Sequence, residues 1–425
     1  MLQARRERGW VELTERYGKN FRYQGALATC DPAVIETLLM HREHTQERSI
    51  TYKFAAKVVS GAPGLLFMDG ADWLQQLHAA MPPLTRASVQ AYAQTVHATT
   101  DATLNQWHDG TQIPDLYRTM TELGLQVVLR VGYGLDPHDP LAAAFGATLM
   151  RYKLSTMSTP ARIYEFGFSL GQLRHTTRFV SDYFFLRRSM CDLRQQLQAI
   201  LDAGAAKYQP NWISLFSKLD VPLEVMADGL NHLYGAFNAI DYSLTCALYE
   251  LSRHPEWAER LRTELDAVLG TRTYPSPHDF AALPQMMAFM KEIFRHYPVT
   301  GAVVRRSGTP LMVEGEEFPA RQEVLILVNA LHHHPDFWAD PFTFNPTRWL
   351  DTPEPAVLYS YIPFLVGPRQ CIGRHLAELH FVVTLNALLR RFRVQALDHS
   401  AQILPFLIPR FEHPLPAIIH SVRET

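Results

Sequence analysis

The sequence predicts a mainly α-helical protein with small β-sheets. Residues Leu223–Arg253 contain no proline, and at 1.5 Å per residue they would form a rod of roughly 45 Å, long enough to cross a whole domain. The pattern from about residue 65 to residue 218 is also mainly helical, whereas the strand-like pieces are short. No linker, low-complexity tract or internal repeat divides the chain, so we expect one domain over residues 1–425.

The composition is that of an ordinary globular protein, with 47% hydrophobic and 19% charged residues. A net charge of -2 gives no support to a nucleic-acid partner. The four cysteines lack a CxxC spacing, which indicates neither a disulfide framework nor a zinc site and fits a reducing compartment. The charged N-terminal segment contains no apolar stretch that could span a bilayer. We expect a cytoplasmic monomer. The alternative of a membrane anchor that was removed from a longer natural chain stays open.

The first elements are expected in the order helix, strand, helix. Residues 10–17 have a helical pattern, and residues 21–29 alternate as a strand does. Asp31 is a suitable N-cap for a helix that runs to about Met40. A Gly/Pro-punctuated stretch at residues 61–64 then precedes the long helical region.

Prolines delimit the elements of the second half. Pro222 stands where a helix tolerates proline best, and Pro255 ends the long helix that follows. Further helices are expected at residues 257–269 and after Pro284. Strands are expected at residues 311–313 and 323–328, and the tail at residues 402–422 has the pattern of strands and turns.

A single cysteine near the C-terminus, Cys371, is the most informative residue. A thiolate, not a thiol, binds metal. A long amphipathic helix that begins near Ile372 would point free N–H groups and its positive dipole end at the sulfur, and both lower the thiol pKa. Four residues lie at fixed spacings from this cysteine, three before it and one after it: Phe364, Gly367, Arg369 and Gly373.

This spacing resembles the haem-thiolate loop of the cytochromes P450, FxxGxRxCxG. The resemblance implies the cytochrome P450 fold and a haem b cofactor with Cys371 as the axial iron ligand, a ligand that favours O–O cleavage. Gly367 would let the backbone turn and approach the ring closely. Arg369 would offer paired donors to a haem propionate, and Phe364 would shield the sulfur side of the porphyrin.

The resemblance implies further cofactor contacts in two places. Arg305 stands where the family commonly has a propionate-binding arginine on a strand, and Arg306 is its competitor. Trp73 resembles the start of the family's WxxxR helix motif, but Leu77 occupies the arginine position. The adjacent His78 is a candidate to replace that arginine as a donor.

A buried charge network is also implied. Glu292 and Arg295 are three residues apart on one helix and can pair. Downstream, residues 340–349 resemble the family's PERF/PERW element, with Thr347 where glutamate is usual. The family arginine of that element, here Arg348, joins the pair behind the haem loop, so we expect a structural role for all three. The run His332–His334 is expected to be a solvated or hydrogen-bonded loop rather than a metal site.

The long helix departs from the family pattern [A/G]Gx[D/E]T. The matching positions are Gly235, Ala236, Phe237, Asn238 and Ala239, so an amide replaces the acid and a methyl group replaces the alcohol. In an ordinary monooxygenase the acid and the alcohol deliver protons during dioxygen activation, and a positioned donor is worth roughly 10²–10⁴ in rate. All of these positions except Phe237 are expected to line the oxygen side of the haem, where the small residues leave room.

Three interpretations of Asn238 and Ala239 stay open. The substrate itself supplies the hydroxyl or carboxylate that organises water, or the enzyme uses peroxide, or it catalyses a coupling, desaturation or rearrangement. We favour the first, because the rest of the chain resembles an ordinary soluble family member. Asp241 and Tyr242, nearly one turn further along, are a protein-borne alternative that would act through water. A non-catalytic haem sensor or ligand-binding protein is the alternative of another class.

The resemblance implies a mostly apolar pocket for a small apolar molecule. The substrate contacts expected from position are Phe237, Val299, Ala302, Val303 and Leu407.

The electron supply is expected to come from another protein. Elements of the haem domain fill the chain, so no fused reductase is expected, and dioxygen use would require a ferredoxin- or flavodoxin-type donor. The basic residues Arg374, Arg390 and Arg391 follow Cys371 and are the expected docking surface.

Overall fold

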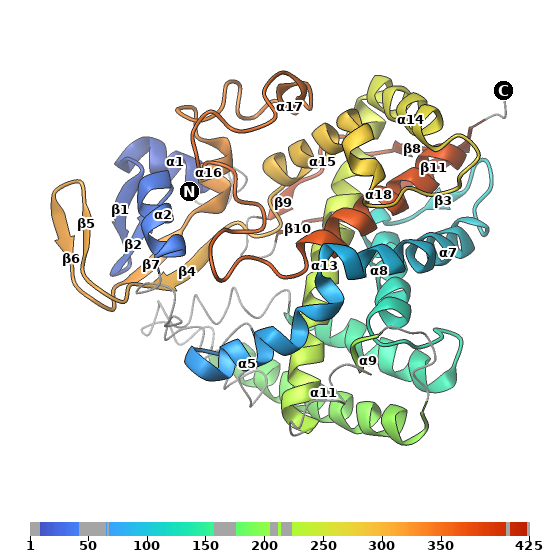
Figure 1. Ribbon diagram of the computed structural model, residues 1–425, viewed down its shortest axis with the longest axis horizontal. Helices are drawn as coiled ribbons and strands as arrows, with labels where there is room; N and C mark the ends of the chain where they lie inside the picture. The colour runs from blue at the N-terminus through green and yellow to red at the C-terminus, as the bar shows by residue number, and fades with distance from the viewer. Residues whose placement is uncertain are drawn as a thin grey trace.

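The computed structural model describes residues 9–41, 65, 68–156, 176–204, 211–213, 223–404 and 409–422. Within these ranges the side chains at 153–156, 176–183, 186, 223–225, 227–238, 404 and 410 are not described. A sheet with its flanking helices lies on one side of the molecule and a larger helical part lies on the other (Figure 1). No helix in the described ranges is both long and apolar enough to cross a membrane.

The predicted long helix is confirmed as α13, Leu223–Arg253, with 31 residues. It runs through the helical part and contacts α8, Leu116–Val131, and α18, Arg374–Arg391 (Figure 1). It ends where Pro255 begins the next helix. The other long helices of this part are α7 (Ala93–Leu104), α9 (Pro140–Thr156), α11 (Thr176–Asp202), α14 (Pro255–Leu269) and α15 (Pro284–His296).

The main sheet has four strands in the order β1-β2-β7-β4. Its strands are β1 (Asn20–Tyr23), β2 (Ala26–Thr29), β7 (Glu323–Ile326) and β4 (Val303–Arg306). Strands β2 and β7 are parallel and the other two pairs are antiparallel. The helices beside this sheet are α1 (Gly9–Tyr17), α2 (Pro32–Met40) and α16 (Val328–His333) (Figure 1). As predicted, Asp31 caps α2, and its carboxylate accepts a hydrogen bond of 2.9 Å from the Ala33 N–H.

Three smaller sheets complete the β structure of the described ranges. A three-stranded sheet joins β3 (Gln112–Ile113), β11 (Ala417–Ser421) and β8 (Phe392–Ala396). The other two are the hairpin of β5 (Leu311–Val313) with β6 (Glu316–Phe318) and the pair of β9 (Ile403–Leu404) with β10 (Arg410–Phe411).

The strand expected over residues 21–29 is in fact a hairpin of β1 and β2. Gln24 and Gly25 form its two-residue turn, with φ values of 50° and 84°. Two successive positive φ values give the turn whose twist matches that of antiparallel strands. The single-strand prediction was wrong because this turn carries only one glycine as a local signal.

Two hydrophobic cores meet at the segment that carries Cys371. The larger core lies among the helices and the smaller one lies between the main sheet and α2. Phe364 packs against the helical core, whereas the next two residues, Leu365 and Val366, pack against the sheet core. The loop before Cys371 is therefore anchored on both sides.

The histidine run was expected to be a solvated or hydrogen-bonded loop, and the solvated alternative is wrong. His332 and His333 end the short helix α16, and all three histidines are buried. The His332 Nε2 accepts a hydrogen bond of 3.0 Å from the Ile362 N–H, and the His333 Nδ1 donates to the Asn329 carbonyl at 3.0 Å. No cluster of three or more His, Cys, Asp or Glu side chains in the described residues could hold a metal ion. The hydrogen bonds and burial of His332 and His333 show that they are packed in the interior.

Burial makes these histidines sensitive to acid. Desolvation lowers the pKa of His333 to about 4 and holds the pKa of His332 well below its usual range. The unfolded chain takes up these protons first, as the pH falls below about 6.5. Stability from these groups is therefore complete above that pH and is lost as the pH falls toward the folded pKa, by about 1.4 kcal/mol per histidine per pH unit.

We predict that the free energy of unfolding falls less steeply with decreasing pH in His333→Gln than in the wild type. The two slopes should differ by the amount that one bound proton contributes, about 1.4 kcal/mol per pH unit. Urea unfolding between pH 7 and pH 5 would measure the slope. Gln keeps a donor for the Asn329 carbonyl, and the exposed His108→Gln serves as the control. Equal slopes for the wild type and His333→Gln would contradict a neutral buried histidine at this position.

Candidate functional site

The residues Phe364–Cys371, here called the cysteine loop, close on themselves through backbone hydrogen bonds. The Cys371 N–H donates to the Phe364 carbonyl at 2.8 Å, and the Gln370 N–H donates to the Gly367 carbonyl at 3.0 Å. Leu365 and Gly367 both adopt positive φ values, of 55° and 78°. The loop geometry that presents the cysteine is therefore held by its own backbone.

Gly367 is required by contact with α2. A Cβ at this position would lie 1.9 Å from the Leu39 carbonyl oxygen, a backbone atom that cannot easily move. The positive φ confirms the predicted turn. The backbone of α2 approaches Gly367 closely, and the expected approach to the haem ring stays a prediction.

The surroundings of the Cys371 sulfur suit a thiolate ligand. Helix α18 begins at Arg374, and the backbone N–H groups of Gly373 and Arg374 donate to the sulfur, as the helix-terminus argument predicts. Burial raises the pKa of the thiol, while these N–H groups and the Arg374 charge act in the opposite direction. A bound metal ion would hold the sulfur as a thiolate outright.

The Cys371 side chain is also exposed, although surrounding protein desolvates it enough to raise its pKa. The exposure of the residue and the desolvation of its thiol agree if Cys371 borders a space that is walled by protein. Because the residue has exposed surface, it is not sealed in a core. The ring of Phe364 lies close by, edge-on to Phe294 at 5.4 Å and 5.8 Å from the Arg374 guanidinium. An accessible sulfur with aligned N–H donors fits an axial haem ligand.

Arg369 projects from the cysteine loop toward α5, Gly70–Ala80. Its guanidinium lies 4.0 Å from the centre of the Trp73 ring, donates to the Met68 carbonyl at 2.9 Å and pairs with Asp69 at 3.3 Å. Burial lowers the pKa of Arg369 to about 10, Asp69 opposes this shift, and the charge of Arg305 adds to it. Arg369 thus lies beside Trp73 and within electrostatic range of Arg305, which comes from a distant part of the chain. Two such charges fit anionic haem propionates.

The competitor Arg306 lies in a different environment from Arg305. Arg305 is buried on β4, whereas Arg306 is half-buried and donates to the Arg321 carbonyl at 3.2 Å. The interior position favours Arg305 for a contact with a buried cofactor.

His78 does not share the buried side of α5. Its side chain is exposed, whereas Gln76 and Ala80 are buried. Both amide atoms of Gln76 are buried with no hydrogen-bond partner among the described residues. Sequence reasoning missed this amide, although it directly precedes the Leu77 that replaces the family arginine.

On the long helix, the residues from Ala239 onward make contacts within the protein. Ala239 is half-buried, and its carbonyl accepts a hydrogen bond of 3.0 Å from the Ser243 hydroxyl one turn later. The Asp241 carboxylate packs against α8, where a Cβ on Gly124 would lie 1.9 Å from its Oδ1. Tyr242 donates to the Cys246 sulfur and packs 5.7 Å from the Phe411 ring. The Asp241 and Tyr242 side chains are therefore engaged with other parts of the structure.

The residues just before Ala239 are known only by their backbone. The side chains of Ala236, Phe237 and Asn238 are not among those that the structure describes. Their expected places beside the oxygen or the substrate therefore stay predictions.

The expected substrate contacts receive unequal support. Ala302 and Val303 are buried in the core beside the main sheet, and their expected contact with a substrate stays a prediction. Val299 is half-buried against the helical core and stays a candidate. Leu407 lies outside the described residues.

The structure brings together the predicted charge network. Arg295 donates to both carboxylate oxygens of Glu292, at 2.9 and 2.8 Å, and Arg348 donates at 3.2 Å. Trp349 and the Asn345 N–H add donors at 2.9 Å each. Burial pushes the pKa of Glu292 upward, but the hydrogen bonds and charge of Arg295, with the charge of Arg348, leave it lowered. The carboxylate is therefore ionised and fully paired.

We predict that Glu292→Ala yields insoluble or haem-poor protein. The change leaves the buried Arg295 and the half-buried Arg348 without a counter-charge, and breaking such a group typically costs about 3–5 kcal/mol. Soluble yield and the ratio of haem absorbance to protein absorbance would measure the effect. Glu122→Ala, which removes an exposed ion pair with Arg118, is the matched control and should behave as wild type. A soluble, fully haem-loaded Glu292→Ala protein would refute the structural role.

Comparison with known proteins identifies the family of this chain. A model of the cytochrome P450 family matches residues 7–409. Pentalenene oxygenase of Streptomyces avermitilis is 25% identical over 403 residues, which cover 92% of this chain and 86% of that protein. Cytochrome P450 734A1 of Arabidopsis thaliana is 24% identical over 421 residues, covering 94% and 78%.

A solved structure shows the same fold. The 6-coordinated cytochrome P450 from Thermus thermophilus superimposes with a TM-score of 0.73 at 21% identity, and the match covers 97% of each chain. The predicted fold is therefore confirmed. With the family match over residues 7–409 and the cysteine loop in place, the chain belongs to the cytochrome P450 family.

Proposed function

We propose that this protein is a haem-thiolate monooxygenase that oxidises a mostly apolar small molecule and takes its proton-organising group from the substrate. Family membership supports the general activity. The observation that carries the proposal is Cys371, an exposed residue whose sulfur receives the N–H groups at the start of α18.

Haem b is the cofactor that these residues fit. When bound, it supplies the dioxygen chemistry that a cysteine ligand promotes. Cys371 would hold the iron, and Arg369 and Arg305 would bind the propionates. The N–H groups of Gly373 and Arg374 spread the negative charge of the sulfur and limit how much of it reaches the metal.

Proton supply is the step in which this chain differs from an ordinary family member. Ala239 has no proton to give, and Ser243 directs its hydroxyl proton to the Ala239 carbonyl. Asp241 faces α8. A substrate hydroxyl or carboxylate placed near Ala239 would fill this gap, which supports substrate-assisted delivery.

The electron source and location are further parts of the proposal. Dioxygen chemistry needs electrons, for which we propose a ferredoxin- or flavodoxin-type donor. We also propose a cytoplasmic location, which accords with the scattered cysteines and with cysteines that are all free in the described structure.

We predict that Cys371→Ala abolishes the red-shifted Soret band that thiolate ligation gives to the ferrous carbon monoxide complex. The variant loses the sulfur that binds the iron. Absorbance spectra of the reduced, carbon monoxide-treated protein would measure the band. Cys191→Ala changes an exposed free cysteine and should keep it. Retention of the band in Cys371→Ala would overturn the proposed function.

We predict that Ala239→Thr changes the fraction of electrons that reach product, because it adds an alcohol where the long helix lacks one. A substrate would first be found by Soret shifts across a metabolite library. The wild type should couple well to a substrate that carries a hydroxyl or carboxylate and about 10²-fold less well to the analogue without it. Ala239→Thr should recover part of the coupling that is lost with the analogue. Ala239→Val, which has the shape of threonine without its hydroxyl group, should not. Equal coupling of both compounds in the wild type would refute substrate assistance.

The same assay tests two of the remaining interpretations. Turnover with hydrogen peroxide but not with a donor protein and dioxygen would favour a peroxide-using enzyme. Tight spectral binding without product under both conditions would favour a sensor or ligand-binding protein.

A further inference from the structure

Gln76 of α5 has a buried side chain whose hydrogen-bonding groups are unused. The residue is 7% exposed, and neither its Nε2 nor its Oε1 has a hydrogen-bond partner among the described residues. A buried donor or acceptor without a partner costs free energy, and such groups are rare in folded proteins. The amide therefore marks a place where a bound group would complete the hydrogen bonding.

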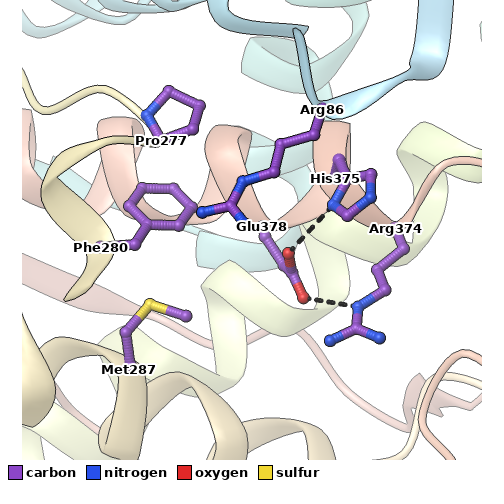
Figure 2. A pocket seen from close by; sticks show the side chains of 7 residues that line it. All are labelled: Arg86, Pro277, Phe280, Met287, Arg374, His375 and Glu378. Carbon is purple, nitrogen blue, oxygen red and sulfur yellow. Dashed lines mark hydrogen bonds and ion pairs between the residues drawn. The ribbon is translucent and has the colours of Figure 1, made fainter.

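The half-buried Glu378 of α18 provides a comparison. It lines a hollow in the surface beside the start of that helix (Figure 2). Its carboxylate accepts a hydrogen bond of 2.9 Å from the Arg374 Nε and lies 3.7 Å from the His375 Nδ1 (Figure 2). Glu378 thus has two basic partners within the chain, whereas the more deeply buried Gln76 has none among the described residues.

Gln76 shares one face of α5 with Trp73. Side chains three residues apart lie on the same side of a helix, and Gln76 lies about 4.5 Å further along the axis. Trp73 is half-buried, with the Arg369 guanidinium 4.0 Å from its ring centre. Gln75 and His78 are exposed on the other side. The Gln76 amide therefore lies on the face of α5 that contacts the cysteine loop.

A carboxylate is the ligand that suits this face. Arg369 brings a positive charge, and the charge of Arg305 acts on the same place. Arg369 spends some of its donors within the chain, at 2.9 Å on the Met68 carbonyl and at 3.3 Å on Asp69. A carboxylate has about four acceptor sites, so one that binds beside Arg369 can accept from a further donor. The amide of Gln76 carries two N–H donors.

The residue after Gln76 cannot supply that donor. Leu77 stands where the family motif WxxxR has its arginine, and its half-buried side chain has no hydrogen-bonding group. His78, the donor expected from the sequence, is exposed. On this stretch of α5, the buried polar group is therefore the amide of Gln76.

We propose that Gln76 is a cofactor-binding residue whose Nε2 group donates to a haem propionate in place of the arginine that Leu77 replaces. The inference rests on the proposed function and assigns a contact of its cofactor. An amide is neutral and carries an acceptor as well as donors, whereas a guanidinium is always charged and only donates. Gln76 can therefore bind the carboxyl group in either protonation state, whereas an arginine favours the ionised one.

The test measures how fast the haem-loaded protein loses haem to an excess of apomyoglobin, followed by absorbance. This measurement involves no turnover. Gln76→Leu removes the hydrogen bond but keeps a buried side chain of similar size, and we expect it to speed haem loss about tenfold. Gln75→Leu makes the same change at the exposed neighbour and is the matched control. It should change the rate by less than about twofold.

A double variant distinguishes a lost haem contact from a general loosening of α5. Leu77→Arg restores the family's arginine next to position 76. Gln76→Leu combined with Leu77→Arg should therefore regain most of the haem retention, to within about threefold of the wild-type rate. A packing defect at position 76 would not be repaired by adding a charge at the half-buried position 77.

Haem loss from Gln76→Leu at a rate within twofold of the wild type would overturn the inference. Equal acceleration in Gln75→Leu would overturn it as well, and so would a double variant that loses haem as fast as Gln76→Leu. A wild-type carbon monoxide spectrum without the red-shifted Soret band would reject the proposed function. A normal spectrum with an unchanged rate of haem loss in Gln76→Leu would reject the Gln76 contact alone.

Discussion

One buried carboxylate, that of Glu292, holds together the parts that present the metal ligand. It accepts hydrogen bonds from Arg295, Arg348 and the Trp349 indole, which come from two distant segments. The Trp349 ring lies 4.6 Å from the ring of Tyr361, which in turn donates to a carbonyl of the helix that carries Glu292. Tyr361 stands three residues before the cysteine loop. The ion pairs of Glu292 with Arg295 and Arg348 thus help to position the start of the cysteine loop. An arginine left there without a counter-charge would disturb the site.

The cysteine loop joins two cores, and this explains how a loop can be a rigid ligand platform. Adjacent residues of the loop pack against different cores, and Gly367 admits the Leu39 carbonyl of α2. The sulfur is left exposed while N–H groups at the start of α18 point at it. Rigid packing and a preformed donor set spare the site a reorganisation when charge develops on the sulfur.

The two sides of the site differ in how completely the chain supplies its own chemistry. On the sulfur side, backbone donors, Phe364 and Arg374 are all in place. On the long helix, where we propose that the oxygen side lies, Ala239 offers a methyl group, and the Ser243 hydroxyl one turn later is directed back to the helix backbone. Such an arrangement favours a bound molecule that brings its own polar group.

The sequence by itself determined the features that depend on spacing and on local backbone chemistry. The FxxGxRxCxG pattern identified Cys371, prolines delimited α13, and the residue types at 238 and 239 led to the proposal of substrate-assisted proton delivery. Only the tertiary structure decided that Gly367 faces Leu39, that Asp241 faces α8, that His332–His334 are buried and that Arg390 and Arg391 are already paired. These properties arise from contacts between segments far apart in the chain, so no local pattern encodes them. Burial then decides which charged side chains lose contact with water, because desolvation acts only once the fold has formed.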